Sequence, residues 1–227
     1  MLSRIFPVVA ALGVLTLSTA AMAVTIDATD SLYDAAGGTT YDSTGTSPVL
    51  INIPTGATFV TFSVSGTISM DSGTHKNDPD GIGAQQGLTT NPWNNISGIT
   101  LPWAGSLGGL FLSNSSPGSP APASLDYTTL GTGNASYTPL IAQTFFIGDG
   151  LTGDGAGSTQ IFYIPTGATR LYLGYADACN YGGNPGCYND NTGSVSASYA
   201  FDAPEPAPFM VLATALVGLA VARRRRV

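Results

Sequence analysis

The fold is decided most clearly by residues 58–68, which read Thr-Phe-Val-Thr-Phe-Ser-Val-Ser-Gly-Thr-Ile. Every second residue from Val60 to Ile68 is apolar or glycine, and the residues between them are threonine or serine. Alternate side chains of an extended chain point to opposite faces, so this stretch has one apolar and one polar face. The pattern is typical of a strand that buries one side.

Shorter alternating stretches lie on both sides of this segment, at residues 49–53, 160–164, 170–175 and 194–201. No stretch keeps an apolar period of 3.6 residues, and turn-forming residues are frequent throughout. Many short strands in one chain of this length predict an all-β protein, built as a β-sandwich or jelly roll.

The sequence Ile-Pro-Thr-Gly-Ala-Thr occurs twice, at residues 53–58 and 164–169. Proline fixes φ at the second position of a turn, and a glycine that follows accepts a positive φ. Each copy follows a short predicted strand and leads into another. We therefore expect two equivalent turns, one for each sheet of the sandwich.

Both ends of the chain carry targeting signals. Arg4 precedes an apolar stretch at residues 5–17, and small residues follow up to Ala23. These features predict a helical signal peptide at residues 1–23, removed by signal peptidase after Ala23. The chain is therefore expected to be exported.

The C-terminal segment, residues 204–227, has three parts: a proline-rich break, an apolar run at residues 207–222, and a basic cluster. As a helix the apolar run spans about 24 Å, just short of a bilayer core of about 30 Å. The basic cluster favours a cytoplasmic C-terminus. An ordinary membrane anchor would have the same parts. The break and the cluster consist of Pro204, Glu205, Pro206, Arg223, Arg224, Arg225 and Arg226.

This tail closely resembles the PEP-CTERM sorting signal of Gram-negative bacteria. The resemblance implies that a transmembrane helix holds the chain in the inner membrane until an exosortase removes the tail. The released body would be one domain, residues 24–203, in the cell envelope, on the outer surface or in the extracellular matrix.

The body between these signals is strongly acidic. Of the 7 basic residues only Lys76 and Arg170 belong to it, and of the 14 acidic residues all except Glu205 are aspartates within it. Such a charge excludes nucleic-acid binding through phosphate neutralisation. It suits calcium as an extracellular counter-ion, although an acidic surface also keeps a secreted protein soluble.

The loop from Tyr175 to Ser194 holds the densest set of oxygen-bearing side chains in the chain. Asp177 ends one predicted strand, and Asp190 and Asn191 precede the next, so a closed loop would bring the three together. Carboxylate and amide oxygens are typical calcium ligands. Aspartate and asparagine also form turns without any metal, so both interpretations remain open.

Cys179 and Cys187 are the two cysteines of the chain, and both lie in this loop. In an oxidising compartment outside the cytoplasm, two cysteines in one domain usually pair. We therefore expect a disulfide between them.

Residues 171–199 resemble the C-terminal part of the bacterial calcium-dependent galactophilic lectins, which are small jelly rolls. The resemblance rests on Tyr-Ala-Asp at 175–177, Pro-Gly-Cys-Tyr at 185–188 and Asp-Asn-Thr-Gly-Ser-Val at 190–195. It implies a bound Ca²⁺ that bridges protein and sugar hydroxyls. The implied ligands are the side chains of Asp177, Asp190 and Asn191, the main-chain carbonyl of Cys187, and a carbonyl near Met70.

The same resemblance implies a first sugar-contacting segment at Asp78-Pro79-Asp80. The histidine and glutamine that contact galactose in these lectins stand here as Asp78 and Gly81, so galactose preference is not implied. His75 lies nearby and is a candidate sugar contact or an exposed loop residue.

Three further features leave alternatives open. Trp93 and Trp103 are candidates either for sugar stacking or for the core. Asp149 and Asp154 fall in a glycine-rich segment and are expected to serve a turn rather than calcium. No nucleophile motif or selected carboxylate pair indicates an enzyme.

These features predict a secreted, exosortase-processed module that binds calcium and a carbohydrate such as an exopolysaccharide. The alternative is a structural surface or matrix protein that assembles with itself and binds no ligand.

Overall fold

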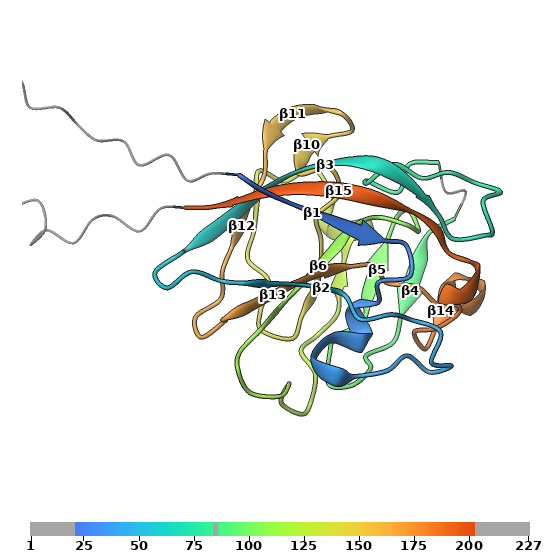
Figure 1. Ribbon diagram of the computed structural model, residues 1–227, viewed down its shortest axis with the longest axis horizontal. Helices are drawn as coiled ribbons and strands as arrows, with labels where there is room; N and C mark the ends of the chain where they lie inside the picture. The colour runs from blue at the N-terminus through green and yellow to red at the C-terminus, as the bar shows by residue number, and fades with distance from the viewer. Residues whose placement is uncertain (1–20, 84–85, 203–227) are drawn as a thin grey trace, which may run out of the picture.

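The computed structural model describes residues 21–83 and 86–202 (Figure 1). The predicted sorting segment and the signal peptide up to Ala20 lie outside these residues. Within the described part, no helix is long and apolar enough to cross a membrane. Strand β1 (Met22–Asp27) includes the last two residues of the predicted signal peptide.

The regular elements of the described chain are almost all β-strands, so the predicted all-β class is confirmed. The helical pieces within it are single turns: η1 (Leu32–Gly37), α1 (Tyr127–Leu130), η2 (Cys179–Tyr181) and η3 (Tyr188–Asp190). The strands after β1 are β2 (Val49–Asn52), β3 (Phe59–Ser69), β4 (Leu88–Thr90), β5 (Ile99–Leu101), β6 (Gly108–Leu112), β7 (Leu125–Asp126), β8 (Ser136–Tyr137), β9 (Thr144–Phe146), β10 (Leu151–Gly153), β11 (Ala156–Thr159), β12 (Ile161–Tyr163), β13 (Arg170–Gly174), β14 (Gly182–Gly183) and β15 (Thr192–Phe201).

The longest sheet has the strand order β1-β15-β3-β12-β8. Its centre is the antiparallel pair of β3 and β15, in which Ala197 lies opposite Val64 and Phe201 opposite Val60. The predicted apolar faces of both strands are buried as expected. Gly66 breaks the alternation: its φ is +124°, and a Cβ there would lie 2.8 Å from the Ser194 oxygen.

Two further four-stranded sheets have the orders β2-β13-β6-β9 and β14-β4-β5-β7, and β10 and β11 form a separate hairpin. In Figure 1 the long strands β3, β15 and β1 form one layer, and β2 and β13 run in another. Aromatic side chains join the first two sheets in the core. The ring of Phe162 on β12 lies 5.7 Å from that of Phe145 on β9 and 5.4 Å from that of Phe62 on β3.

The two copies of the six-residue repeat form matching turns. The Ala57 and Ala168 amides donate to the carbonyls of Pro54 (3.1 Å) and Pro165 (3.0 Å). Each turn joins the same two sheets in opposite directions, from β2 to β3 and from β12 to β13. The repeat is therefore a device for crossing between sheets.

The two ends of the described chain lie side by side. Met22 on β1 pairs with Tyr199 on β15. Just beyond β15, the Asp202 carboxylate accepts hydrogen bonds from the Thr58 amide (2.7 Å), the Thr58 hydroxyl (2.6 Å) and the Phe59 amide (3.0 Å). This clasp ties the end of β15 to the start of β3.

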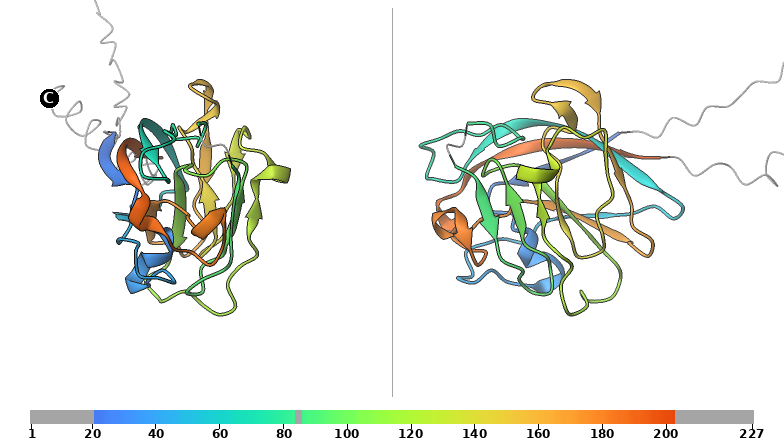
Figure 2. Two further views of the ribbon diagram at one scale, coloured as in Figure 1. Left: turned by 90° about the vertical axis from the view of Figure 1, so that its right-hand side faces the viewer. Right: turned by 180° about the vertical axis from the view of Figure 1, so that it is seen from behind.

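The loop between β13 and β15 lies at the other end of β15. Figures 1 and 2 both place η2, β14 and η3 at the end of the molecule opposite the start of β1. The predicted calcium residues are therefore grouped at one pole of the fold.

Candidate functional site

The loop between β13 and β15 is closed by the predicted disulfide between Cys179 and Cys187, which is confirmed. The Gly186 amide donates to the Asp177 carbonyl at 3.1 Å, and Ala178 and Pro185 form an antiparallel bridge. These bonds fold the second half of the loop back onto the end of β13.

Tyr188 fixes the same region from the core. Its side chain is fully buried; its hydroxyl donates to the Tyr175 carbonyl at 3.0 Å and accepts from the Asp177 amide at 3.0 Å. The backbone position of Asp177 is therefore set by Tyr175, at the start of the loop, and by Tyr188, near its end.

The carboxyl group of Asp177 is buried without a positive partner. The residue is 3% exposed, and the one ion pair within the described residues is that of His75 with Asp71. Burial raises the pKa of Asp177 to about 8, and the carboxylates of Asp190 and Asp42 add to the rise. The Asn191 side chain and the Ala178 amide, which donates at 2.7 Å, oppose it.

Asn191 places its side-chain amide beside this carboxyl group. Its amide nitrogen donates to the Ala28 carbonyl at 3.1 Å, which leaves the side-chain oxygen to face the other way. That oxygen is buried, has no hydrogen-bond partner, and belongs to a residue only 6% exposed. It is one of six such side-chain atoms in the described residues, and a buried polar atom of this kind can be satisfied by a water molecule or an ion.

The other three predicted calcium residues belong to segments that meet at this point. The Ser72 amide donates to the Asp190 carbonyl at 2.8 Å, and Ser69 pairs with Thr192, so Met70 runs beside the start of β15. Cys187 directly follows Gly186, the residue bonded to Asp177. The loop thus gathers all five positions, and their role as ligands stays a prediction.

The structure adds two residues to this group that the sequence did not single out for it, Asp71 and Tyr181. Burial raises the pKa of the Tyr181 hydroxyl, and the charges of Asp71, Asp177 and Asp190 raise it further. These three carboxylates therefore all act on the Tyr181 hydroxyl. No local motif marks Asp71, because it reaches the loop only through the path of the chain after β3.

His75 stands at the edge of the same group. Its amide donates to Asp71 Oδ1 at 2.8 Å, and its ring Nδ1 contacts Asp71 Oδ2. Partial burial acts to raise the pKa of Asp71, but the hydrogen bonds from His75 and Ser69 lower it overall. The imidazole is 40% exposed, so its other nitrogen can reach an outside ligand.

Asp42 approaches the disulfide, and its carboxylate lies within reach of both cysteine sulfurs. These sulfurs are bonded to each other and are not free to hold a metal. The carboxylate instead accepts the Cys187 amide at 2.7 Å and the Thr44 hydroxyl at 2.7 Å. Asp42 therefore holds the loop between η1 and β2 against the disulfide.

Asp78 and Asp80, the other predicted sugar contacts, belong to a second acidic group. Asp80 Oδ1 accepts the Asp149 amide at 3.0 Å, and Asp149 in turn accepts the Val64 amide at 3.0 Å through its carbonyl. Val64 precedes Ser69 on β3 by five positions, which corresponds to roughly 15 Å along a strand. The two acidic groups are therefore separate along β3.

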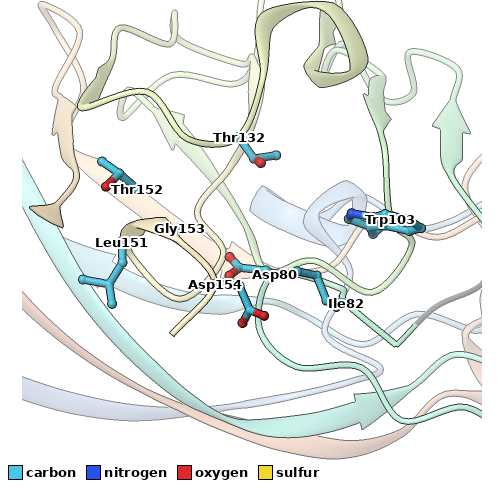
Figure 3. Close-up of a pocket in the computed structure, with 8 residues that line it drawn as sticks. All are labelled: Asp80, Ile82, Trp103, Thr132, Leu151, Thr152, Gly153 and Asp154. Atoms are coloured by element: carbon cyan, nitrogen blue, oxygen red, sulfur yellow. The ribbon is translucent and has the colours of Figure 1, made fainter. Parts of the chain in front are cut away.

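The second group lies next to a pocket (Figure 3). Burial raises the pKa of Asp80 to about 6, and the carboxylates of Asp149, Asp78 and Asp154 contribute to the rise. Burial also raises the pKa of Asp78, with a further contribution from Asp154. The lining residues are Asp80, Ile82, Trp103, Thr132, Leu151, Thr152, Gly153 and Asp154.

The expected turn role of Asp149 agrees with its contacts, since its carboxylate accepts the Leu151 amide at 2.7 Å and the Gly155 amide at 2.8 Å.

The two tryptophans differ in their exposure. Trp93 is half-buried and donates to the Thr39 carbonyl at 2.7 Å, whereas Trp103 is 41% exposed at the pocket. Neither tryptophan belongs to the fully buried core.

The residues at the Asp177 loop fit a hard divalent cation. They offer a buried carboxyl group without a counter-charge and a buried amide oxygen without a partner. Within the described residues, the carboxylates of the loop are not close enough to one another to form a three-ligand group without amide or carbonyl oxygens. Calcium accepts such irregular sets of oxygen ligands. In comparisons with known proteins, the chain matches no protein-family model and has no significant match among curated proteins.

Proposed function

We propose that this protein is a secreted module that binds calcium in the Asp177 loop and, through it, a carbohydrate. The observation that carries the proposal is the buried Asp177 carboxyl group beside the unpartnered side-chain oxygen of Asn191. A cation there would satisfy both groups, whereas without it the fold keeps a carboxyl group in a site that disfavours its charge.

The side chains of Asp177, Asp190 and Asn191 would hold the ion, with carbonyls of Cys187 and the Met70 segment. Bound calcium supplies open coordination positions for vicinal sugar hydroxyls. His75, held by Asp71 at the edge of this group, is placed to contact such a sugar through its free nitrogen. The function is binding rather than catalysis.

We further propose that the body is a β-sandwich exported by its signal peptide and released by an exosortase that recognises the tail. The paired cysteines agree with an oxidising compartment outside the cytoplasm. An exopolysaccharide of the producing cell is the proposed partner.

Calorimetry on the purified protein tests the calcium site. Wild type is expected to bind Ca²⁺ and to melt about 5–10 °C higher in calcium than in EDTA, as binding at about 100 times Kd adds about 2.7 kcal/mol. Asp177→Asn should lose both effects. Asp27→Asn, which removes an equally negative but exposed charge, should keep them. Equal melting of wild type and Asp177→Asn in both buffers contradicts the proposal.

A structural role remains the second candidate, because the edges of two sheets are open. β1 and β2 are edge strands, and Leu50 on β2 is 49% exposed. Open edges allow strands of two molecules to pair. Light scattering that shows assembly with rising concentration, without glycan or calcium, would favour this role.

A further inference from the structure

The pocket beside Trp103 shares no lining residue with the Asp177 loop. It has a volume of about 60 Å³, which is room for a few water molecules or one small polar group. Figure 3 shows Asp80 and Asp154 close together below Thr132, with Trp103 to one side. The pocket is therefore open to part of a ligand whose remainder lies outside.

The indole of Trp103 is the feature that points to a ligand. A large aromatic side chain normally buries its face, but this ring is 41% exposed at the pocket, next to Ile82 at 42%. An exposed indole can bind the face of a sugar ring and can also attract a cation to its π-system.

The charge of the pocket selects between these ligands. Asp80 and Asp154 line it, and Asp78 and Asp149 lie behind them. No lysine or arginine in the described part of the chain forms an ion pair with any of these carboxylates. The negative charge is therefore available for a positive ligand.

Neither of the two basic residues in the described part of the chain, Arg170 and Lys76, forms an ion pair with these carboxylates. The Arg170 guanidinium donates to the Ser113 carbonyl and to the Tyr172 hydroxyl, on another part of the surface. Lys76 is exposed to solvent and makes no ion pair within residues 21–83 and 86–202. An external cation is the remaining partner for the carboxylates.

We propose that this pocket binds the ammonium group of an amino sugar, with the sugar ring against Trp103. The carboxylates of Asp80 and Asp154 would surround the ammonium group, and the hydroxyls of Thr132 and Thr152 are placed for the ring hydroxyls. The choice of a sugar as the carrier rests on the proposed function. The pocket itself includes no residue of the Asp177 loop, so it requires no calcium.

Titration calorimetry in EDTA at pH 6.5 tests the inference with three probes of equal length. These are a β-1,4-linked glucosamine tetramer, the same tetramer with every nitrogen acetylated, and tetralysine. We expect the glucosamine tetramer to bind at least tenfold more tightly than the other two, to quench tryptophan fluorescence, and to weaken with added salt because the attraction is electrostatic.

Two variants should reduce this affinity at least tenfold: Asp80→Asn, which removes the charge, and Trp103→Ala, which removes the exposed ring. Asp27→Asn and Tyr163→Ala are the matched controls, because each changes an exposed side chain of the same kind elsewhere. Asp177→Asn should bind the tetramer as wild type does, which separates this site from the calcium site.

Four results would overturn the inference. Equal binding of the acetylated tetramer would show that charge plays no part, and unchanged binding by Asp80→Asn would place the ligand elsewhere. Equal or tighter binding of tetralysine would make the pocket a site for basic peptides. If the Asp177→Asn variant still bound Ca²⁺ and the double variant Asp177→Asn, Asp80→Asn did not, the pocket would be a metal site.

Discussion

The hydroxyl of Tyr188 donates a hydrogen bond to the Tyr175 carbonyl and accepts one from the amide of Asp177, each at 3.0 Å. One buried side chain thus joins the residue before the loop, the candidate metal ligand and the turn that leads to Asp190. The arrangement makes the geometry of the candidate site depend on a residue that would not itself touch the ion.

Replacement of Tyr188 by phenylalanine should therefore affect both stability and calcium binding. The variant leaves the buried Asp177 amide without an acceptor, which costs about 1–3 kcal/mol, whereas the Tyr175 carbonyl still accepts the Leu32 amide at 3.1 Å. We expect urea denaturation to show a loss of about 2 kcal/mol and calorimetry to show weaker calcium binding. Tyr172→Phe, a change on the second sheet, should leave the calcium affinity unchanged.

The stability of the metal-free protein should fall as the pH rises. Burial raises the pKa of Asp177 to about 8 in the folded state, above an unfolded value near 4. A carboxyl group with a raised pKa stabilises the fold below the unfolded pKa, and this contribution is lost as the pH rises through the folded value. Between pH 6 and pH 8 the loss is about 2 kcal/mol, or about 4–8 °C in melting temperature.

Thermal melts in EDTA at these two pH values measure this loss. Asp177→Asn has no carboxyl group to ionise, so its melting temperature should change much less over the same range. Burial raises the pKa of Asp80 to about 6, so ionisation of Asp80 also lowers the stability as the pH rises, mainly below pH 6. The comparison therefore starts at pH 6. A wild type that melts at the same temperature at both pH values would contradict the prediction.

Removal of the disulfide should destabilise the fold moderately. Cys179 and Cys187 are 8 positions apart, and closing so short a loop restricts the unfolded chain by about 2.5 kcal/mol. The double variant Cys179→Ala, Cys187→Ala is expected to lose about this much in urea denaturation. If the disulfide also orders the calcium loop, calcium should bind more weakly than to wild type.

The Asp202 clasp should mark the C-terminal limit of the stable body. Its carboxylate accepts three hydrogen bonds from Thr58 and Phe59. Asp202→Ala is expected to cost about 1–2 kcal/mol, because the amides lose a charged acceptor. A chain that ends at Asp202 should be as stable as the longer chain. Asp27→Ala, on an exposed part of β1, is the control.

The sequence was sufficient to locate the strands that bury one face. The alternation at residues 58–68 and 194–201 predicts β3 and β15, which pair along their length. It was not sufficient for β6 and β9, in which every residue is buried. A strand that is covered on both faces has no alternation, so periodicity cannot distinguish it from other apolar segments.

The two candidate sites also differ in whether the sequence was sufficient to predict them. The Asp177 loop was predictable because its residues lie close together in the sequence and the disulfide closes them. The pocket was not, because Asp80, Trp103, Thr132 and Asp154 come from four distant segments. The resemblance to lectins implied that Asp78 and Asp80 contact a sugar beside the calcium site, but the structure groups them with Asp149 and Asp154, apart from the Asp177 loop.

The pairing of Met22 with Tyr199 has a consequence for how the body would be oriented if either end were anchored. Both chain ends leave the fold at one pole, and the Asp177 loop lies at the other, ten residues of β15 away, or about 30 Å. If either end were anchored to a membrane, the Asp177 loop would therefore lie at the end of the body farthest from the anchor.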